Sequence, residues 1–85
     1  MQLALTSSQV KVLIDANAGL FPHDTDEWAA SQGDIQMLMG LGLVEMSGES
    51  DLILAGDASA IVEKAASTDY TVFPVESQVL FVFNL

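Results

Sequence analysis

The chain of 85 residues contains no cysteine and no arginine, and Lys11 and Lys64 are its only lysines. The absence of cysteine excludes disulfide bonds and thiolate metal sites. Affinity for nucleic acid comes largely from Lys and Arg side chains that neutralise phosphates. Two lysines in a chain of net charge -10 therefore disfavour direct binding of nucleic acid, and the same charge disfavours anionic membrane surfaces.

Long apolar runs are also missing, so the sequence contains no candidate membrane span, and its first residues lack the basic stretch of a signal peptide. We therefore expect a cytoplasmic protein, with the interior of an assembled particle as the alternative location. The hydrophobic fraction of 51% predicts a folded chain, and the length fits one domain over residues 1–85.

What the chain has in excess is negative charge. Its twelve acidic residues are spread along the sequence, so we expect them to cover a folded surface rather than to form an acidic tail. This surface has two interpretations. It keeps copies of the protein apart in solution, or it binds a basic partner.

The first half of the chain predicts three helices. Residues 6–9, Thr-Ser-Ser-Gln, match a capping box and predict a helix over residues 7–17 that ends before Gly19. A second, short helix follows the cap Asp24 and ends at Gly33. A third helix over residues 35–41 starts from Asp34 and is closed by Gly42.

The second half predicts mostly strands. Residues 43–46 and 52–54 form a hairpin around a polar turn, and residues 57–66 form a fourth helix. Residues 71–85 are strand-like and interrupted by Pro74. The expected core consists of Leu5, Val10, Leu13, Ile14, Trp28, Ile35, Leu38, Leu43, Leu54, Ile61 and Val62, together with two of the three methionines Met37, Met39 and Met46.

Three segments carry a resemblance to small winged helix-turn-helix proteins of bacteria and bacteriophages. Residues 5–13 (LTSSQVKVL) are similar to the opening "L-T-x-x-Q-x-x-V-L" of such proteins. Residues 35–45 (IQMLMGLGLVE) resemble their "I-x-x-L-x-x-x-G-L-V-E", and residues 52–62 (LILAGDASAIV) resemble "L-T-x-x-G-x-x-x-I-V". The resemblance covers roughly residues 5–66. It implies an α+β, winged-helix-like domain of three helices, a β-hairpin wing and a fourth helix, to which a C-terminal β-strand is added.

The chain departs from this family where DNA would be bound. The third helix would enter the major groove, yet it offers Asp34, Gln36 and methionines and no basic residue. The wing offers Glu45, Glu49 and Asp51 where basic residues would approach phosphates. We therefore expect that the chain keeps the winged-helix-like fold of this family but lacks the basic residues with which the family binds DNA.

These observations predict a non-catalytic, acidic protein-binding module of phage type, which inhibits or modulates a host protein or serves in a particle. The alternative is a DNA mimic that inhibits a nucleic-acid-binding protein, as anti-restriction and anti-CRISPR proteins do. A transcriptional regulator that binds DNA is a distant third. The candidate partner-binding residues are Asp24, Asp26, Glu27, Glu45, Glu49, Asp51, Leu80 and Val82.

The sequence gives little evidence for a catalytic site or for a metal-binding site. His23, the only histidine, lies beside Asp24, Asp26 and Glu27, which suggests a weak divalent-metal site, but capping of the second helix explains these acids as well. One histidine, no G-x-S-x-G and no Gly-rich phosphate loop argue against an enzyme. We therefore expect no cofactor and no metal.

The C-terminal residues 78–85 form the strongest β segment and carry no charge. In a strand, Val79, Phe81 and Phe83 share one face and Leu80 and Val82 the other, so both faces are apolar. We expect this strand to pair with residues 3–5 or with another chain. Two roles stay open: it completes the sheet of its own domain, or it takes part in self-association or in a host interface.

Overall fold

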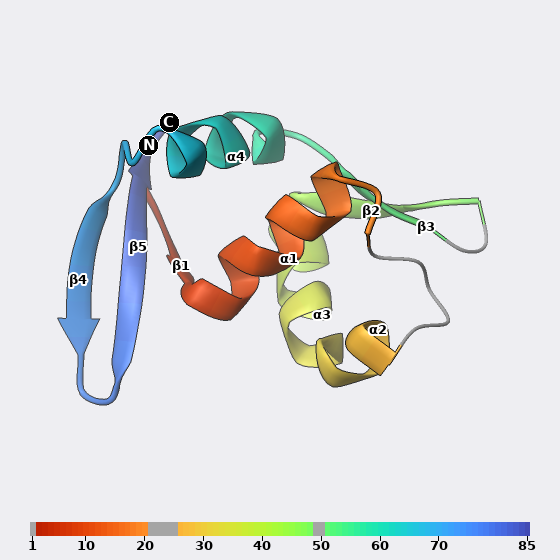
Figure 1. Ribbon diagram of the computed structural model, residues 1–85, viewed down its shortest axis with the longest axis horizontal. Coiled ribbons are helices and arrows are strands. Elements are labelled where there is room, and N and C mark those ends of the chain that lie inside the picture. The colour runs from red at the N-terminus through yellow and green to blue at the C-terminus, as the bar shows by residue number, and fades with distance from the viewer. Residues whose placement is uncertain (1, 21–25, 49–50) are drawn as a thin grey trace.

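The computed structural model describes residues 2–20, 26–48 and 51–85. Within these ranges the chain forms a mixed α+β fold of four helices and two small sheets (Figure 1). The proposals made for His23, Asp24 and Glu49 fall outside the described residues. In chain order the elements are β1 (Gln2–Thr6), α1 (Ser7–Asn17), α2 (Asp26–Ala30), α3 (Gln32–Gly40), β2 (Val44–Ser47), β3 (Asp51–Leu54), α4 (Ala58–Ala66), β4 (Thr71–Val75) and β5 (Gln78–Asn84).

The larger sheet joins the two ends of the described chain. Its strand order is β1-β5-β4, and both pairings are antiparallel. Leu3 lies opposite Phe83, and Leu5 lies opposite Phe81. The predicted pairing of the C-terminal segment with residues 3–5 is therefore confirmed within this one chain.

The prediction of a single added C-terminal strand is wrong, because residues 71–85 form two strands. β4 and β5 are joined by a tight turn through Glu76 and Ser77, with Val75 opposite Gln78. Glu76 takes a positive φ of 54°, which few residues other than glycine and asparagine adopt readily. The turn carries no Gly, Asn or Pro, and this explains why the sequence did not mark it as a turn.

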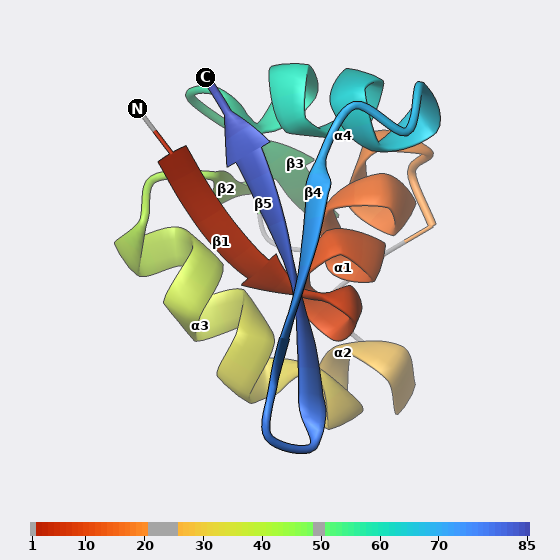
Figure 2. The ribbon, with the colours of Figure 1, turned by 90° about the vertical axis from the view of Figure 1, so that its left-hand side faces the viewer.

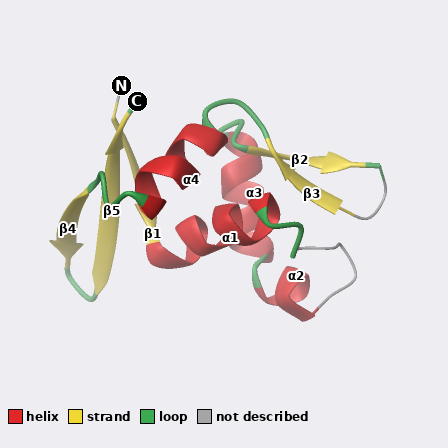
Figure 3. Cartoon of the chain, turned by 45° about the horizontal axis from the view of Figure 1, so that its top comes forward, coloured by secondary structure: helices red, strands yellow, loops and turns green. Residues whose placement is uncertain are grey.

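The core lies between the helices and one face of this sheet (Figure 2). The hairpin of β2 and β3 closes the other side of the helical body (Figure 3). Six of the eleven predicted core residues are buried, and Val10, Trp28, Leu54 and Val62 are partly buried against the core. Of the three methionines, Met39 and Met46 are partly buried against it, and Met37 is exposed.

The junction of β1 and α1 contains no loop, because Thr6 is both the last residue of the strand and the N-cap of the helix. The Thr6 Oγ1 accepts a hydrogen bond from the Gln9 N–H at 3.3 Å. The Gln9 Oε1 accepts one from the Thr6 N–H at 3.0 Å. This is the predicted capping box, and the predicted bounds of the helix are also confirmed.

The inward side of α1 differs by one residue from the prediction. The helix buries Gln9, Val12, Leu13 and Ala16, whereas Ile14 is 43% exposed, so its assignment to the core is wrong. The buried stripe starts at a polar residue because both ends of the Gln9 amide are used. Its oxygen accepts the bond from Thr6, and its Nε2 lies 2.9 Å from the Met37 Sδ as a donor. The first turn of the stripe is polar and its third turn offers only the small Ala16, so an apolar pattern alone misses its phase.

The boundary between α2 and α3 also differs from the prediction. Gly33 does not end α2, and Asp34 does not start α3, because α3 already begins at Gln32 and includes both residues. Ser31 alone separates the two helices. Its N–H donates to the Glu27 carbonyl at 3.0 Å, and its carbonyl accepts from the Ile35 N–H at 2.9 Å. Because this backbone serves both helices, no glycine break is needed between them.

The longer helices end in one common arrangement, in which the residue after the C-cap has positive φ. After α1, the Leu20 N–H donates to the Asp15 carbonyl at 2.8 Å, around Gly19 at φ 72°. After α4, the Asp69 N–H donates to the Lys64 carbonyl at 2.8 Å, around Thr68 at φ 58°. Both are Schellman motifs, but a β-branched threonine is strained at positive φ.

We expect Thr68→Gly to raise the free energy of unfolding by about 1 kcal/mol, because glycine removes the strain at positive φ at some entropic cost in the unfolded chain. Urea unfolding followed by circular dichroism measures this change. Ser67→Gly is the matched control, because Ser67 has a negative φ of -90° and should only lose stability. An equal effect of both substitutions would contradict the assignment of strain to Thr68.

We expect Gln9→Ala to lower the free energy of unfolding by about 1–2 kcal/mol, because the Thr6 N–H loses its acceptor and the Met37 Sδ loses its donor, while the Thr6 Oγ1 still caps the Gln9 backbone N–H. Gln36→Ala, at an exposed position of α3, should change it by less than about 0.5 kcal/mol. Met37→Leu tests the sulfur contact separately in the same urea titration. A Gln9→Ala variant as stable as Gln36→Ala would show that the capping box is energetically unimportant.

Candidate protein-binding surfaces

Four carboxylates lie at one end of the molecule, which we call the acidic end: Asp26, Glu27, Glu45 and Asp51. The first two belong to α2, and the others belong to β2 and β3. All four residues are exposed. Figures 1 and 3 show α2 and the β2–β3 hairpin at the opposite end of the molecule from β4 and β5. The described acidic residues that the sequence singled out therefore lie at the end of the long axis away from the larger sheet, one pair on α2 and the other on the hairpin.

The β2–β3 hairpin turns its acidic side to solvent. Glu45 lies opposite Ile53, and Ser47 lies opposite Asp51. Residues directly opposite in an antiparallel pair share a face, so these four residues form the outer face of the hairpin. All four are exposed, while residues on the other face, such as Leu52, are buried or partly buried. This outer face therefore combines two carboxylates with an exposed isoleucine.

Trp28 attaches α2, which has no buried residue of its own, to the rest of the molecule. Its side chain is partly buried against the core, and its carbonyl accepts a hydrogen bond from the Gln32 Nε2 at 3.3 Å. Trp28 therefore contacts the core, as the sequence predicts. Through this contact Asp26 and Glu27 are held at the acidic end.

Neither lysine neutralises the acidic end directly. The Lys11 Nζ lies 2.9 Å from a carboxylate oxygen of Asp15, and the Lys64 Nζ lies 3.2 Å from one of Asp69. The hydrogen bond and the charge of Asp15 raise the pKa of Lys11 above 10.5, with a smaller contribution from the charge of Glu27. Because the chain has no further Lys or Arg, none of the four carboxylates forms an ion pair with a lysine or arginine, and only Glu27 interacts with one, through the charge of Lys11.

Leu80 and Val82 lie far from the acidic end, on the larger sheet, so the predicted site residues fall into two separate groups. Both are partly buried, but neither packs against the core. They share the sheet face turned away from the helices. The sequence analysis missed the exposed apolar residues beside them in β4, Phe73 and Val75. The sequence does show an apolar run at residues 72–75. The exposure of its side chains, however, depends on β4 being an edge strand.

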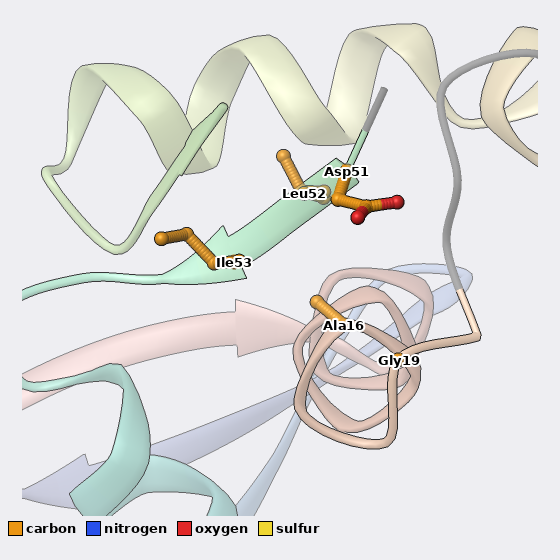
Figure 4. Close-up of a pocket in the computed structure, with 5 residues that line it drawn as sticks. All are labelled: Ala16, Gly19, Asp51, Leu52 and Ile53. Atoms are coloured by element: carbon orange, nitrogen blue, oxygen red, sulfur yellow. The ribbon is translucent and has the colours of Figure 1, made fainter. Parts of the chain in front are cut away.

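Two small cavities offer little for chemistry. One, of about 140 Å³, lies between β3 and the C-terminal end of α1, and Asp51 is the only ionisable residue among the described residues that line it (Figure 4). The other, of about 340 Å³, lies between the start of α1 and the β4–β5 turn, and hydroxyl and amide groups supply its polar lining. Among the described residues, no three carboxylates or imidazoles come together as metal ligands. In the same part of the chain, no helix is long and apolar enough to cross a membrane.

No protein-family model, curated protein or solved structure was found that matches this chain. The coarse fold therefore stands on the elements and pairings described above.

The Lys11–Asp15 pair gives a pH-dependent prediction. A raised pKa means that the folded protein holds this proton more tightly than the unfolded chain does, so the stabilisation is complete below pH 10.5 and is lost as pH rises through the raised value. We expect the midpoint of thermal unfolding of Lys11→Gln to lie below that of the original protein by a constant amount between about pH 7 and about pH 9. The difference should shrink above pH 10.5. A difference that is independent of pH would contradict the pairing.

Proposed function

We propose that this chain is a non-catalytic, acidic protein-binding module whose acidic end binds a basic protein. The observation that carries the proposal is the exposure of Asp26, Glu27, Glu45 and Asp51 at one end of the molecule, while the two lysines form their ion pairs with Asp15 and Asp69. Uncompensated carboxylates on one surface attract a basic partner over several ångströms and orient it before contact.

The outer face of the β2–β3 hairpin suits a protein partner because it also offers apolar area. Ile53 is exposed between Glu45 and Asp51 along the hairpin. Interfaces combine a small apolar centre with a polar rim, and charge at the rim contributes more to the rate of association than to affinity. We therefore expect the carboxylates to steer the partner and Ile53 to contribute contact area.

The finer assignment of the fold is part of this proposal. The order of three helices, a hairpin and a fourth helix agrees with a winged-helix-like domain of phage type, in which α3 and the β2–β3 hairpin would face DNA. Here α3 exposes Gln36, Met37 and Leu41, and it carries no basic residue. We propose that such a surface acts on a host protein in the cytoplasm, as an inhibitor or modulator, or serves inside a particle.

The second candidate function is a DNA mimic, in which the same carboxylates occupy the basic groove of a nucleic-acid-binding protein. Its support is also the acidic end, because exposed carboxylates without lysine partners resemble a row of phosphates in charge. The two functions differ in one testable respect, since duplex DNA competes with a mimic for its partner. Direct binding of DNA, the third candidate, has no basic residue of α3 to support it.

The proposal is tested with two variants of equal net charge. The first neutralises the acidic end by Asp26→Asn, Glu27→Gln, Glu45→Gln and Asp51→Asn. The second, the matched control, carries Asp34→Asn, Asp57→Asn, Glu63→Gln and Glu76→Gln. Both are immobilised beside the original protein, and proteins retained from a bacterial lysate are compared over a range of salt concentrations.

We expect the original protein and the control to retain the same basic protein, and the acidic-end variant to lose it with a reduction of at least about tenfold, corresponding to about 1.4 kcal/mol. Retention should fall steeply with added salt, because the attraction is electrostatic. Release by duplex DNA would select the mimic. Equal loss in both variants, or retention of no protein by the original chain, would contradict the proposal.

A further inference from the structure

We infer that the uncovered face of the β1–β5–β4 sheet binds a second copy of this chain, in a weak dimer formed face to face. The apolar residues of this open face are Ala4, Phe73, Val75, Leu80 and Val82, and uncharged polar residues surround them: Gln2, Thr6, Thr71, Gln78 and Asn84. Leu80 lies opposite Phe73, and Val82 lies opposite Ala4, so all five side chains lie on one side of the sheet. The inference goes beyond the proposed function, because it concerns another surface and another partner.

The helices cover only the other side of this sheet. In Figure 2 the sheet lies in front of the helical body, and in Figure 1 all four helices lie to one side of it. Phe83 and Leu5, which point to that side, are completely buried, and Tyr70 packs edge-on against Phe81 with ring centroids 5.0 Å apart. Phe73 on the open face is 58% exposed. The side that faces the helices is therefore a core around Leu5 and Phe83 and is open at Val72 and Val79, near the β4–β5 turn. The other side is exposed to solvent at Phe73.

The distribution of charge favours a second copy as the occupant. The strands β1, β4 and β5 contain no charged residue, whereas every helix and both strands of the small hairpin contain at least one carboxylate. Two copies of a chain with net charge -10 repel each other through any surface that carries carboxylates. The open face is the surface through which they can meet without opposing like charges. A basic partner would instead be drawn to the acidic end.

The shape of the molecule keeps the acidic ends apart in such a dimer. The chain extends 35 Å along its longest axis, with the sheet at one end and the acidic end at the other. Face-to-face packing of two sheets directs the acidic ends outward in opposite directions. Their separation then exceeds the screening length of about 8 Å at physiological ionic strength, so their repulsion is small.

Association by pairing of edge strands is disfavoured at both edges of the sheet, at β4 and at β1. Pro74 in β4 has no N–H and cannot donate to an added strand. At the other edge, the Thr6 N–H already donates to the Gln9 Oε1. Because neither edge offers a complete ladder, the copies meet by their faces, as in a β-sandwich.

The area of the face limits the strength of the dimer. Three strands spaced about 4.8 Å apart and seven residues long cover roughly 330 Å², well below the roughly 800 Å² per partner of a standard stable interface. We therefore expect a dissociation constant on the order of 100 µM rather than a permanent dimer.

Sedimentation equilibrium of the purified protein, from about 10 µM to about 1 mM, tests the inference. We expect the average mass to rise toward twice that of one chain. The association should strengthen between about 50 mM and about 500 mM NaCl, because salt screens the repulsion between copies. This sign is opposite to the salt dependence expected for the basic partner, so the two proposals fail separately.

Phe73→Glu should raise the dissociation constant at least about tenfold, because it places a carboxylate in the dry centre of the interface. Leu20→Glu is the matched control, because Leu20 is 60% exposed and lies after α1, away from the open face. It introduces the same charge and should leave the dissociation constant within about twofold. Far-UV circular dichroism verifies folding, and Val75→Glu repeats the test at a second position of the face.

A protein that stays monomeric at about 1 mM in both salts would overturn the inference. Equal weakening by Phe73→Glu and Leu20→Glu would overturn it as well, because net charge and not the open face would then control association. If both Phe73→Glu and Val75→Glu still associate, the contact lies on another surface, and this result would also overturn the inference.

Discussion

The rest of the structure depends on the junction at Thr6, where a strand passes into a helix without a loop. The reciprocal hydrogen bonds of Thr6 and Gln9 fix the direction in which β1 leaves α1. β5 then pairs along β1, and β4 pairs along β5, so the orientation of the whole sheet relative to the helices follows from this one turn. The same turn places the Gln9 amide in the core beside Met37 and so joins α1 to α3.

This geometry produces a molecule with two unlike ends. The sheet stands at the side where α1 starts, and the small hairpin lies where α1 ends (Figure 1). Every helix and both strands of the hairpin carry a carboxylate, while the strands of the larger sheet carry none and only their β4–β5 turn does, at Glu76. The two ends therefore differ in surface chemistry, one charged and one largely apolar. This separation is a property of the fold and is not visible in the net charge alone.

The parts of the fold that were predictable from the sequence are those with a local chemical signal. The capping box at Thr6 and the glycine at position 42 mark helix ends through specific hydrogen bonds, and both signals were read correctly. The missed features depend on tertiary context. Gln9 is buried because Met37 meets it, and the turn at Glu76 forms because its flanking strands pair, against the preference of the residue itself. The residues of the acidic end were identifiable from the sequence because they are charged. The exposure of Phe73 was not, because it follows from its place in an edge strand.

The pairing of β1 with β5 has a consequence for how the chain folds. Leu3 and Phe83 are eighty positions apart in sequence, whereas the helices and the β2–β3 hairpin form through contacts between near neighbours. Closing a long loop costs entropy before the contact stabilises anything, so local elements assemble first and the large sheet forms late. Before the sheet forms, the residues of β1 at the start of α1 are unpaired and Leu5 is exposed. The speed of folding is therefore set by the search of the two distant strands for each other, and shortening that search by joining the strands would accelerate it.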